Sequence, residues 1–135
     1  MTSPVHRRPV RVGHIEFLNC YPLYYGLEGR RPAAASFELL AGVPTDLNRM
    51  LVAGTIDFGP ISSIAYARNH SLLLLPRRLS ISARGAVDSI QLVCRRPIET
   101  IGTIALTPQS ATSVVLLKTL LRLRYGRDVD YSELR

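Results

Sequence analysis

Small hydroxyl and amide side chains recur at four places where an apolar run gives way to a turn or helix. Asn19 follows the first run, and the later groups are Ser62 and Ser63, Ser80 and Ser82, and Thr107, Gln109, Ser110, Thr112 and Ser113. A helix N-terminus offers unpaired N–H groups and partial positive charge, so a hydroxyl-rich turn there suits an anion. We therefore expect a carboxylate site. The alternative is that each hydroxyl only caps its own helix.

Other catalytic patterns are weak in this sequence. TPQSATS (107–113) lacks the glycines and lysine of a triphosphate-binding loop. Spacing alone assembles no G-x-S-x-G elbow, catalytic carboxylate pair or Cys-His arrangement. Glu16 and Asp57 are interpreted as surface or capping groups. Tyr21, Tyr24 and Tyr25 either wall a pocket for a cyclic ligand or lie at the core edge.

Composition narrows the class of protein. The 135 residues are 47% hydrophobic and 20% charged, which is typical of one soluble globular domain. We see no apolar run of membrane-spanning length and no signal peptide, so we expect a cytoplasmic protein without a membrane partner. The two cysteines and three histidines lack ligand spacing, so we expect neither a metal nor a disulfide framework.

The net charge of +7 raises the question of nucleic acid. The arginines are scattered, however, and no aromatic residues alternate with them as in a binding platform. We therefore expect no nucleic-acid partner, while the positive potential favours a small anionic ligand. The arginine pairs are Arg7-Arg8, Arg30-Arg31, Arg77-Arg78 and Arg95-Arg96.

Short apolar strands alternate with helices along the chain. The pattern predicts strands at 9–15, 37–43, 55–59, 71–76 and 103–108, and helices at 20–27, 44–54, 60–69 and 110–126. Thr45 or Asp46 is expected to cap the second helix; Pro60 would start the third, with Ser62 or Ser63 as its cap. We expect the run at 71–76 to be buried on both faces.

This alternation indicates an α/β fold with a mostly parallel sheet covered by helices. Residues 80–96 are expected to be extended around Gly85. The final residues, RDVDYSELR, look like the opening of another strand. From this ending we expect the chain to be a part of a longer protein.

Four motifs in order resemble the MqnA family, the chorismate dehydratases of the futalosine route to menaquinone. They are RVGHIEFLNCYPLYYGL, IDFGPISSIAYAR, LSISARGAVDSIQLV and ALTPQSATSVVLLKTLL, between Arg11 and Leu121. The resemblance implies a two-lobed fold like the type II periplasmic binding proteins, with the ligand in the cleft. Residues 1–92 would form the first lobe and 93–135 the beginning of the second.

The implied reaction is loss of water from chorismate, giving 3-[(1-carboxyvinyl)oxy]benzoate, by a hydro-lyase without metal or organic cofactor. The resemblance places Asn19 and Ser89 in the active site, where they would orient the substrate. The residues expected to bind the substrate are Ser62, Ser63, Ser82, Thr107, Ser110, Ala111, Thr112 and Ser113. Whether the chain forms a homodimer is left open.

Three alternatives stay open. The sister family of 1,4-dihydroxy-6-naphthoate synthases (MqnD) shares the fold, although FLNCYPLYYGL favours the dehydratases. A non-catalytic module that binds a small anionic solute would use the same fold, because fold alone does not fix function. An inactive fragment would instead show poor solubility, from an uncovered sheet edge or apolar patch.

Overall fold

A computed structural model describes residues 8–29, 37–76 and 79–134 of the chain. The chain forms two compact units, residues 1–61 (unit 1) and 62–135 (unit 2). The arginines at 7, 30, 31, 77 and 78 lie outside the described residues. The expected division into lobes at residues 92 and 93 stays a prediction.

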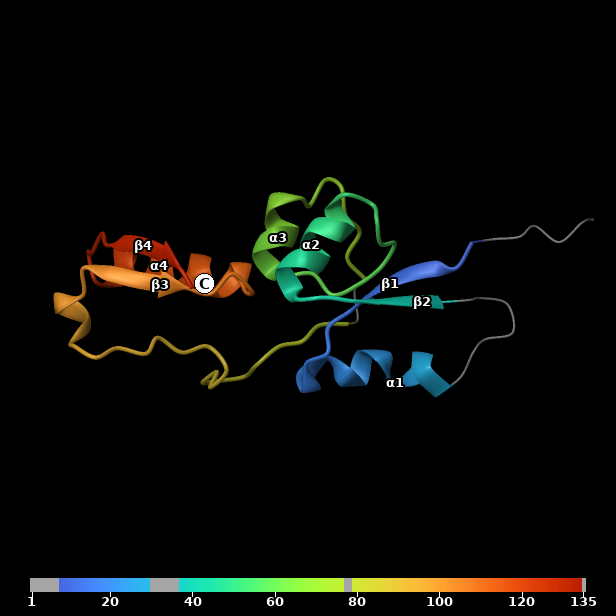
Figure 1. Cartoon of the computed structure of the whole chain (residues 1–135), viewed down its shortest axis with the longest axis horizontal. Helices are drawn as coiled ribbons and strands as arrows, with labels where there is room; N and C mark the ends of the chain where they lie inside the picture. Colours follow the sequence, from blue (N-terminus) through green and yellow to red (C-terminus); the bar gives the residue numbers. More distant parts are fainter. Residues whose placement is uncertain (1–7, 30–36, 77–78, 135) are drawn as a thin grey trace, which may run out of the picture. The chain divides into compact units, whose positions relative to one another are not determined.

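Unit 1 is built on a pair of parallel strands. β1 (Val10–His14) pairs with β2 (Phe37–Ala41), in a register that aligns Val12 with Leu39. A short 3₁₀ helix, η1 (Leu18–Cys20), leads into α1 (Tyr21–Gly29), and α2 (Pro44–Val52) follows β2. Figure 1 draws α1 below the strand pair and α2 above it. The strands predicted at 9–15 and 37–43 and the helices predicted at 20–27 and 44–54 are confirmed.

The core of unit 1 forms where β1 meets the segment after α2. Its buried residues are Val12, Ile15, Cys20, Tyr24, Leu47 and Ile56. A Cβ on Gly13 would lie 2.8 Å from Ile56 Cδ1, and one on Gly59 would lie 3.3 Å from the Gly13 backbone. Glycine at both positions therefore permits the close approach of β1 and residues 56–59.

Residues 55–59 join β1 along its other edge, but only over a short stretch. The predicted strand is reduced to one parallel bridge, between Val12 and Phe58. The Gly13 N–H donates to Phe58 O at 2.8 Å, and the Asp57 N–H donates to Arg11 O at 2.8 Å. In a parallel ladder the next donor to the Gly13 carbonyl would be residue 60, which is a proline and has no N–H. The ladder therefore stops at this point.

The Tyr24 hydroxyl provides hydrogen bonds to the backbone of β1 and Ile15 beyond the point where the ladder stops. It donates to Gly13 O at 3.0 Å and accepts from the Ile15 N–H at 3.2 Å. The Tyr24 side chain is buried, and its burial raises the pKa of the phenol. Tyr24 is thus a core residue that completes the backbone hydrogen bonding at the end of β1.

Unit 2 contains a second parallel strand pair. β3 (Thr103–Leu106) pairs with β4 (Asp130–Glu133), and α4 (Ala111–Arg124) connects them. α3 (Ser63–Arg68) and the 3₁₀ turn η2 (Ile98–Thr100) come before β3. Ile104, Leu121 and Val129 are the buried core. The expectation that 127–135 opens a further strand is confirmed by β4.

Two cationic side chains hold unit 2 together outside this core. The Arg127 guanidinium donates to the carbonyls of Glu99 and Ile101, the second at 2.8 Å, and so ties η2 to the end of α4. Lys118 Nζ lies 4.4 Å from the ring centroid of Tyr131, a cation–π contact that joins α4 to β4.

Three local predictions are wrong. The run at 71–76 forms no strand and pairs with none of the described strands, and Leu74 is fully exposed. Val43 caps α2 with Pro44 as its first residue, while Asp46 lies in the first turn and pairs with Arg49. α3 begins at Ser63 rather than at Pro60.

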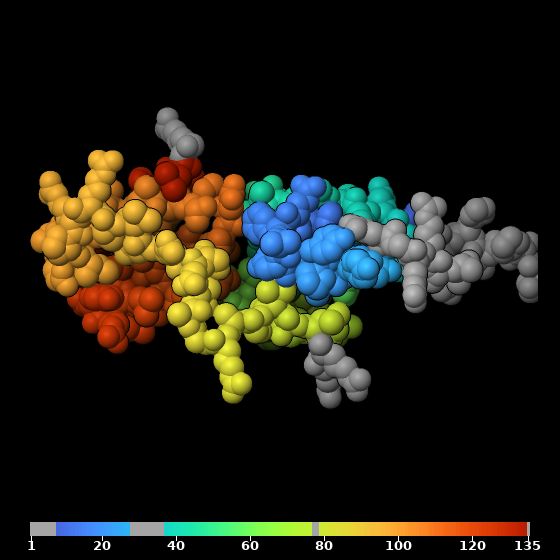
Figure 2. All heavy atoms as spheres, turned by 90° about the horizontal axis from the view of Figure 1, so that it is seen from below, coloured from blue at the N-terminus to red at the C-terminus, as the bar shows by residue number. Residues whose placement is uncertain are grey.

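Residues 79–97 are extended and irregular, as predicted around Gly85, whose φ is +91°. Apolar side chains of this segment are exposed, and Figure 2 shows part of it in yellow and gold at the surface. The α/β class and the parallel pairing are confirmed, with the strands divided between two two-stranded sheets in the described part of the chain.

Candidate functional site

The N-termini of α3 and α4 meet through hydroxyl groups. Thr112 Oγ1, in the first turn of α4, accepts from the Ile64 N–H at 3.5 Å. It also lies 3.4 Å from Ser63 Oγ. Two turns that are 48 residues apart in sequence are therefore brought together, as the carboxylate-site hypothesis requires. We call Ser62, Ser63, Ser110, Thr112 and Ser113 the hydroxyl cluster.

Both helices that contribute to the hydroxyl cluster are capped by its serines. Ser62 Oγ accepts from the Ala65 N–H and Ser110 Oγ accepts from the Ser113 N–H, each at 3.4 Å. The two hydroxyls of Ser110 and Ser113 lie 2.7 Å apart. Ser62 and Ser110 therefore cap their helices, and whether they also bind a ligand stays a prediction. Capping does not account for Thr112, because this hydroxyl reaches the neighbouring helix.

The electrostatics of the hydroxyl cluster favour an anion. α4 is long enough for its N-terminus to carry appreciable partial positive charge. The backbone N–H groups of Ala111 and Thr112 lie in the first turn of α4, where the helix itself provides no carbonyl to accept from them. Thr107 Oγ1 accepts from the Gln109 N–H at 3.2 Å and so shapes the turn that enters α4. A carboxylate placed here would meet N–H and O–H donors together.

Asn19 lies in unit 1, in the 3₁₀ helix that follows β1. Its side chain is exposed, between Leu18 and the buried Cys20. Tyr24 anchors the entry to this loop through Ile15. That Asn19 shares one cleft with the hydroxyl cluster stays a prediction.

Ser82 and Ser89 lie in the irregular segment of unit 2, and both are exposed. Ser82 Oγ is 3.1 Å from Ser80 Oγ. The roles predicted for these two serines therefore stay predictions.

Asp57 is held by arginines. It accepts from the Arg8 guanidinium at 2.7 and 2.8 Å and from the Arg11 backbone N–H at 2.9 Å. Hydrogen bonds from Arg8, and then from Arg11, hold the pKa of Asp57 well below its usual range. Asp57 is therefore an ion-pair residue that ties Arg8 and Arg11 to residues 55–59.

The three tyrosines divide between two environments. Tyr24 is buried and belongs to the core. Tyr21 and Tyr25 are exposed, and their rings meet edge to face with centroids 6.0 Å apart. Only these two of the three could contact a ligand.

Sequence reasoning missed two of these contacts. The signal for the Asp57 ion pairs was the arginine-rich start of β1, which faces residues 55–59 across the sheet. The signal for Tyr24 was Pro60, whose missing N–H leaves a carbonyl without its ladder partner. Both depend on a register that becomes visible only when the segments are paired.

The described ranges contain no group of three or more His, Cys, Asp or Glu side chains arranged to hold a metal ion. None of the helices in these ranges has the length and apolar character that a bilayer crossing requires.

Residues 10–135 match the protein family described as menaquinone biosynthesis. A chorismate dehydratase from Thermus thermophilus is 34% identical over 115 residues. This match covers 85% of the present chain and 41% of the relative. The chain thus spans less than half the length of this relative.

Proposed function

Because the chain belongs to the menaquinone biosynthesis family over residues 10–135, we propose that it serves as a chorismate dehydratase. It would convert chorismate to 3-[(1-carboxyvinyl)oxy]benzoate and water. The observation that carries this proposal is the hydroxyl cluster, in which Thr112 links the N-termini of α3 and α4. Chorismate has two carboxylates, and the N-terminus of α4 offers donors suited to one of them.

The chemistry needs orientation more than a strong protein base. Loss of water makes the ring aromatic, which drives the elimination. As the ring C–H bond breaks, its electron pair forms the new double bond and the C–O bond to hydroxyl breaks. We propose that the enolpyruvyl carboxylate of the substrate takes the proton. It then passes this proton to the departing hydroxide, which leaves as water. Asn19 and Ser89 would orient this carboxylate, and the α4 N-terminus would bind the ring carboxylate.

The same proposal assigns the fold and the site more finely. Residues 1–92 would belong to the first of two lobes like those of type II periplasmic binding proteins, and residues 93–135 to the beginning of the second. Ser62, Ser63, Ser82, Thr107, Ser110, Ala111, Thr112 and Ser113 would line the ligand cleft. A cytoplasmic location stays a prediction, and whether the chain forms a homodimer stays open.

Direct incubation with chorismate tests the reaction. We expect an aromatic product, seen as a new ultraviolet absorbance band and as a separate chromatographic peak of chorismate mass less water. Chorismate that binds tightly but is recovered unchanged would favour the solute-binding module instead. Recovery of chorismate without binding would contradict both functions for this chain.

Single substitutions then test the roles. If turnover is present, Asn19→Ala should lower kcat with a smaller effect on KM, because Asn19 orients the reacting carboxylate. Ser110→Ala should mainly raise KM, because it disturbs the α4 N-terminus. Ser132→Ala, on exposed β4, is the matched control and should change neither constant. Near-normal turnover of Asn19→Ala would exclude Asn19 from catalysis.

A further inference from the structure

Asn19 belongs to a short exposed stretch between β1 and α1, residues 16–19, which we call the arch. All four of its residues are exposed, whereas Ile15 and Cys20, at its two ends, are buried in the core of unit 1. An exposed stretch of backbone makes few contacts of its own, so its orientation depends on how its ends are held. The groups that hold these two ends therefore determine where the Asn19 carboxamide lies.

Tyr24 closes the arch into a ring made of backbone and hydrogen bonds. Because η1 runs directly into α1, Tyr24 lies about one helical turn beyond the arch. Its hydroxyl returns to the start of the arch, where it accepts from the Ile15 N–H at 3.2 Å and donates to Gly13 O at 3.0 Å. The Tyr24 side chain is only 2% exposed, so water does not compete for these two bonds. The chain thus folds back on itself, with Asn19 in the middle of the ring.

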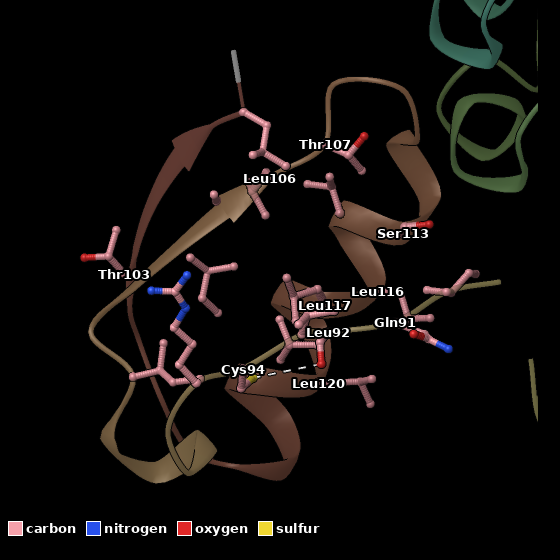
Figure 3. A pocket seen from close by; sticks show the side chains of 18 of the residues that line it. Gln91, Leu92, Cys94, Thr103, Leu106, Thr107, Ser113, Leu116, Leu117 and Leu120 are labelled. Carbon is pink, nitrogen blue, oxygen red and sulfur yellow. Dashed lines mark hydrogen bonds between the residues drawn. The ribbon is translucent and has the colours of Figure 1, made fainter. Parts of the chain in front are cut away.

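The corresponding connection in unit 2 is held in a different way. Figure 3 shows Thr107 where β3 ends and Ser113 where α4 begins. The side-chain oxygens of Thr107 and Ser110 accept from backbone N–H groups of this connection and of the first turn of α4. Residues 15–20 of unit 1 contain neither serine nor threonine, and Phe17, the N-cap of η1, makes no side-chain cap hydrogen bond. The connection in unit 1 therefore depends on a hydroxyl from outside it.

We propose that Tyr24 is a positioning residue, whose hydroxyl fixes the arch and thereby the orientation of the Asn19 carboxamide. This role rests on the proposed function, in which Asn19 orients the reacting carboxylate. Without the hydroxyl the aromatic ring still fills the core, but the Ile15 N–H loses its acceptor and the arch gains freedom. The carboxamide then spends only part of its time in the productive orientation. A displacement of about 1 Å at a reacting group lowers the rate by up to about a hundredfold.

Nuclear magnetic resonance of the full 135-residue chain tests this positioning without any substrate. The order parameter of the Asn19 backbone N–H should be about 0.85, as in a rigid backbone, and should fall below about 0.6 in Tyr24→Phe. The side-chain NH₂ group of Asn19 should lose order in parallel, and relaxation dispersion covers reorientation on the microsecond to millisecond timescale. Val12 in β1 and Leu117 on α4 should keep their values in both proteins.

Asp57→Asn is the matched control for stability. It removes the ion pairs of Asp57 but leaves the hydrogen bonds of Tyr24 in place. Because order parameters describe the folded molecules, a loss of stability alone should leave the Asn19 values unchanged in this variant. If Tyr24→Phe does not fold, the same comparison is made in a Gly26→Ala background, since alanine stabilises a helix where the added Cβ has open space.

Turnover provides a second readout that a merely structural role would not move. Where the chain converts chorismate, Tyr24→Phe should lower kcat by about tenfold or more and change KM by less than about threefold. The small change in KM is expected because the N-terminus of α4, which would bind the ring carboxylate, is not altered. Asp57→Asn should leave both constants within about twofold at temperatures where it is folded.

Three results would overturn the proposal: an Asn19 order parameter below about 0.6 in the unmodified chain, no added motion of Asn19 in Tyr24→Phe, or equal added motion in Asp57→Asn. An equal fall in kcat in both variants would also overturn it, because stability alone would then explain the loss. If the unmodified chain does not convert chorismate, the proposed function fails. The resonance comparison still decides whether Tyr24 fixes the arch, so the two failures are distinguishable.

Discussion

Removing the Tyr24 hydroxyl should destabilise unit 1 out of proportion to the size of the change. In Tyr24→Phe the ring still fills the core, but Gly13 O and the Ile15 N–H lose their partner. Each buried polar group left unpaired costs about 1–3 kcal/mol. Pro60 cannot supply the missing donor to Gly13. We expect the free energy of unfolding of unit 1 to fall by about 2–4 kcal/mol, allowing for some relaxation.

The measurement must separate the two units. Urea unfolding followed by circular dichroism gives the midpoint, and amide exchange at Val12 and Ile56 reports unit 1, with Leu121 as the reference in unit 2. Tyr25→Phe is the control: its side chain is 70% exposed, so it should change stability by less than about 0.5 kcal/mol. A loss as small as this in Tyr24→Phe would refute the role given to the hydroxyl.

The pH dependence provides a second check on Tyr24. Its pKa is raised by burial, so the unfolded chain loses this proton at lower pH than the folded one. The stabilisation is therefore complete below the ordinary tyrosine pKa of about 10 and is lost as the pH rises above it. The variant Tyr24→Phe should lack this alkaline loss.

Three more predictions test other contacts. The folded-state pKa of Asp57 is depressed, so the stability that its ion pairs give unit 1 is present above the ordinary aspartate pKa of about 4 and is lost as the pH falls below it. Asp57→Asn should therefore lower the urea midpoint at neutral pH and flatten this acid dependence. Gly59→Ala should lose about 1–3 kcal/mol by thermal unfolding, because its Cβ would press on backbone. Gly26→Ala, in a helix with open space around it, should instead gain up to about 1 kcal/mol. Thr112→Val should lose about 0.5–1.5 kcal/mol, which Thr112→Ser largely restores, because only the hydroxyl reaches α3.

The sequence alone was sufficient to predict helices and strands where the local pattern and the tertiary packing agree. β1, β2, β3 and α4 lie close to their predicted bounds because each carries the apolar spacing of its element and a clear stop signal. The run at 71–76 was misjudged because four successive leucines give no periodicity, so the run by itself does not distinguish a buried strand from an exposed segment.

The candidate site was predictable in part. Ser62 and Ser110 both act as N-caps; Ser62 was one of the two caps expected for its helix, and for Ser110 capping was the alternative interpretation. The reach of Thr112 to Ile64 could not be predicted, because it depends on how two helices pack rather than on either sequence alone. The position of Asn19 after the first apolar run made it a candidate, but its role in the active site came from the family resemblance.

Pro60 and Tyr24 should be inherited together. With an ordinary amino acid at position 60, a backbone amide could bond the Gly13 carbonyl and would compete with the phenol for it. Natural variants that have exchanged the proline should therefore tolerate phenylalanine at position 24, whereas those that keep it should not. Covariation of positions 24 and 60 in a family alignment would then show that the donor to the Gly13 carbonyl is either the side chain of residue 24 or the main chain of residue 60.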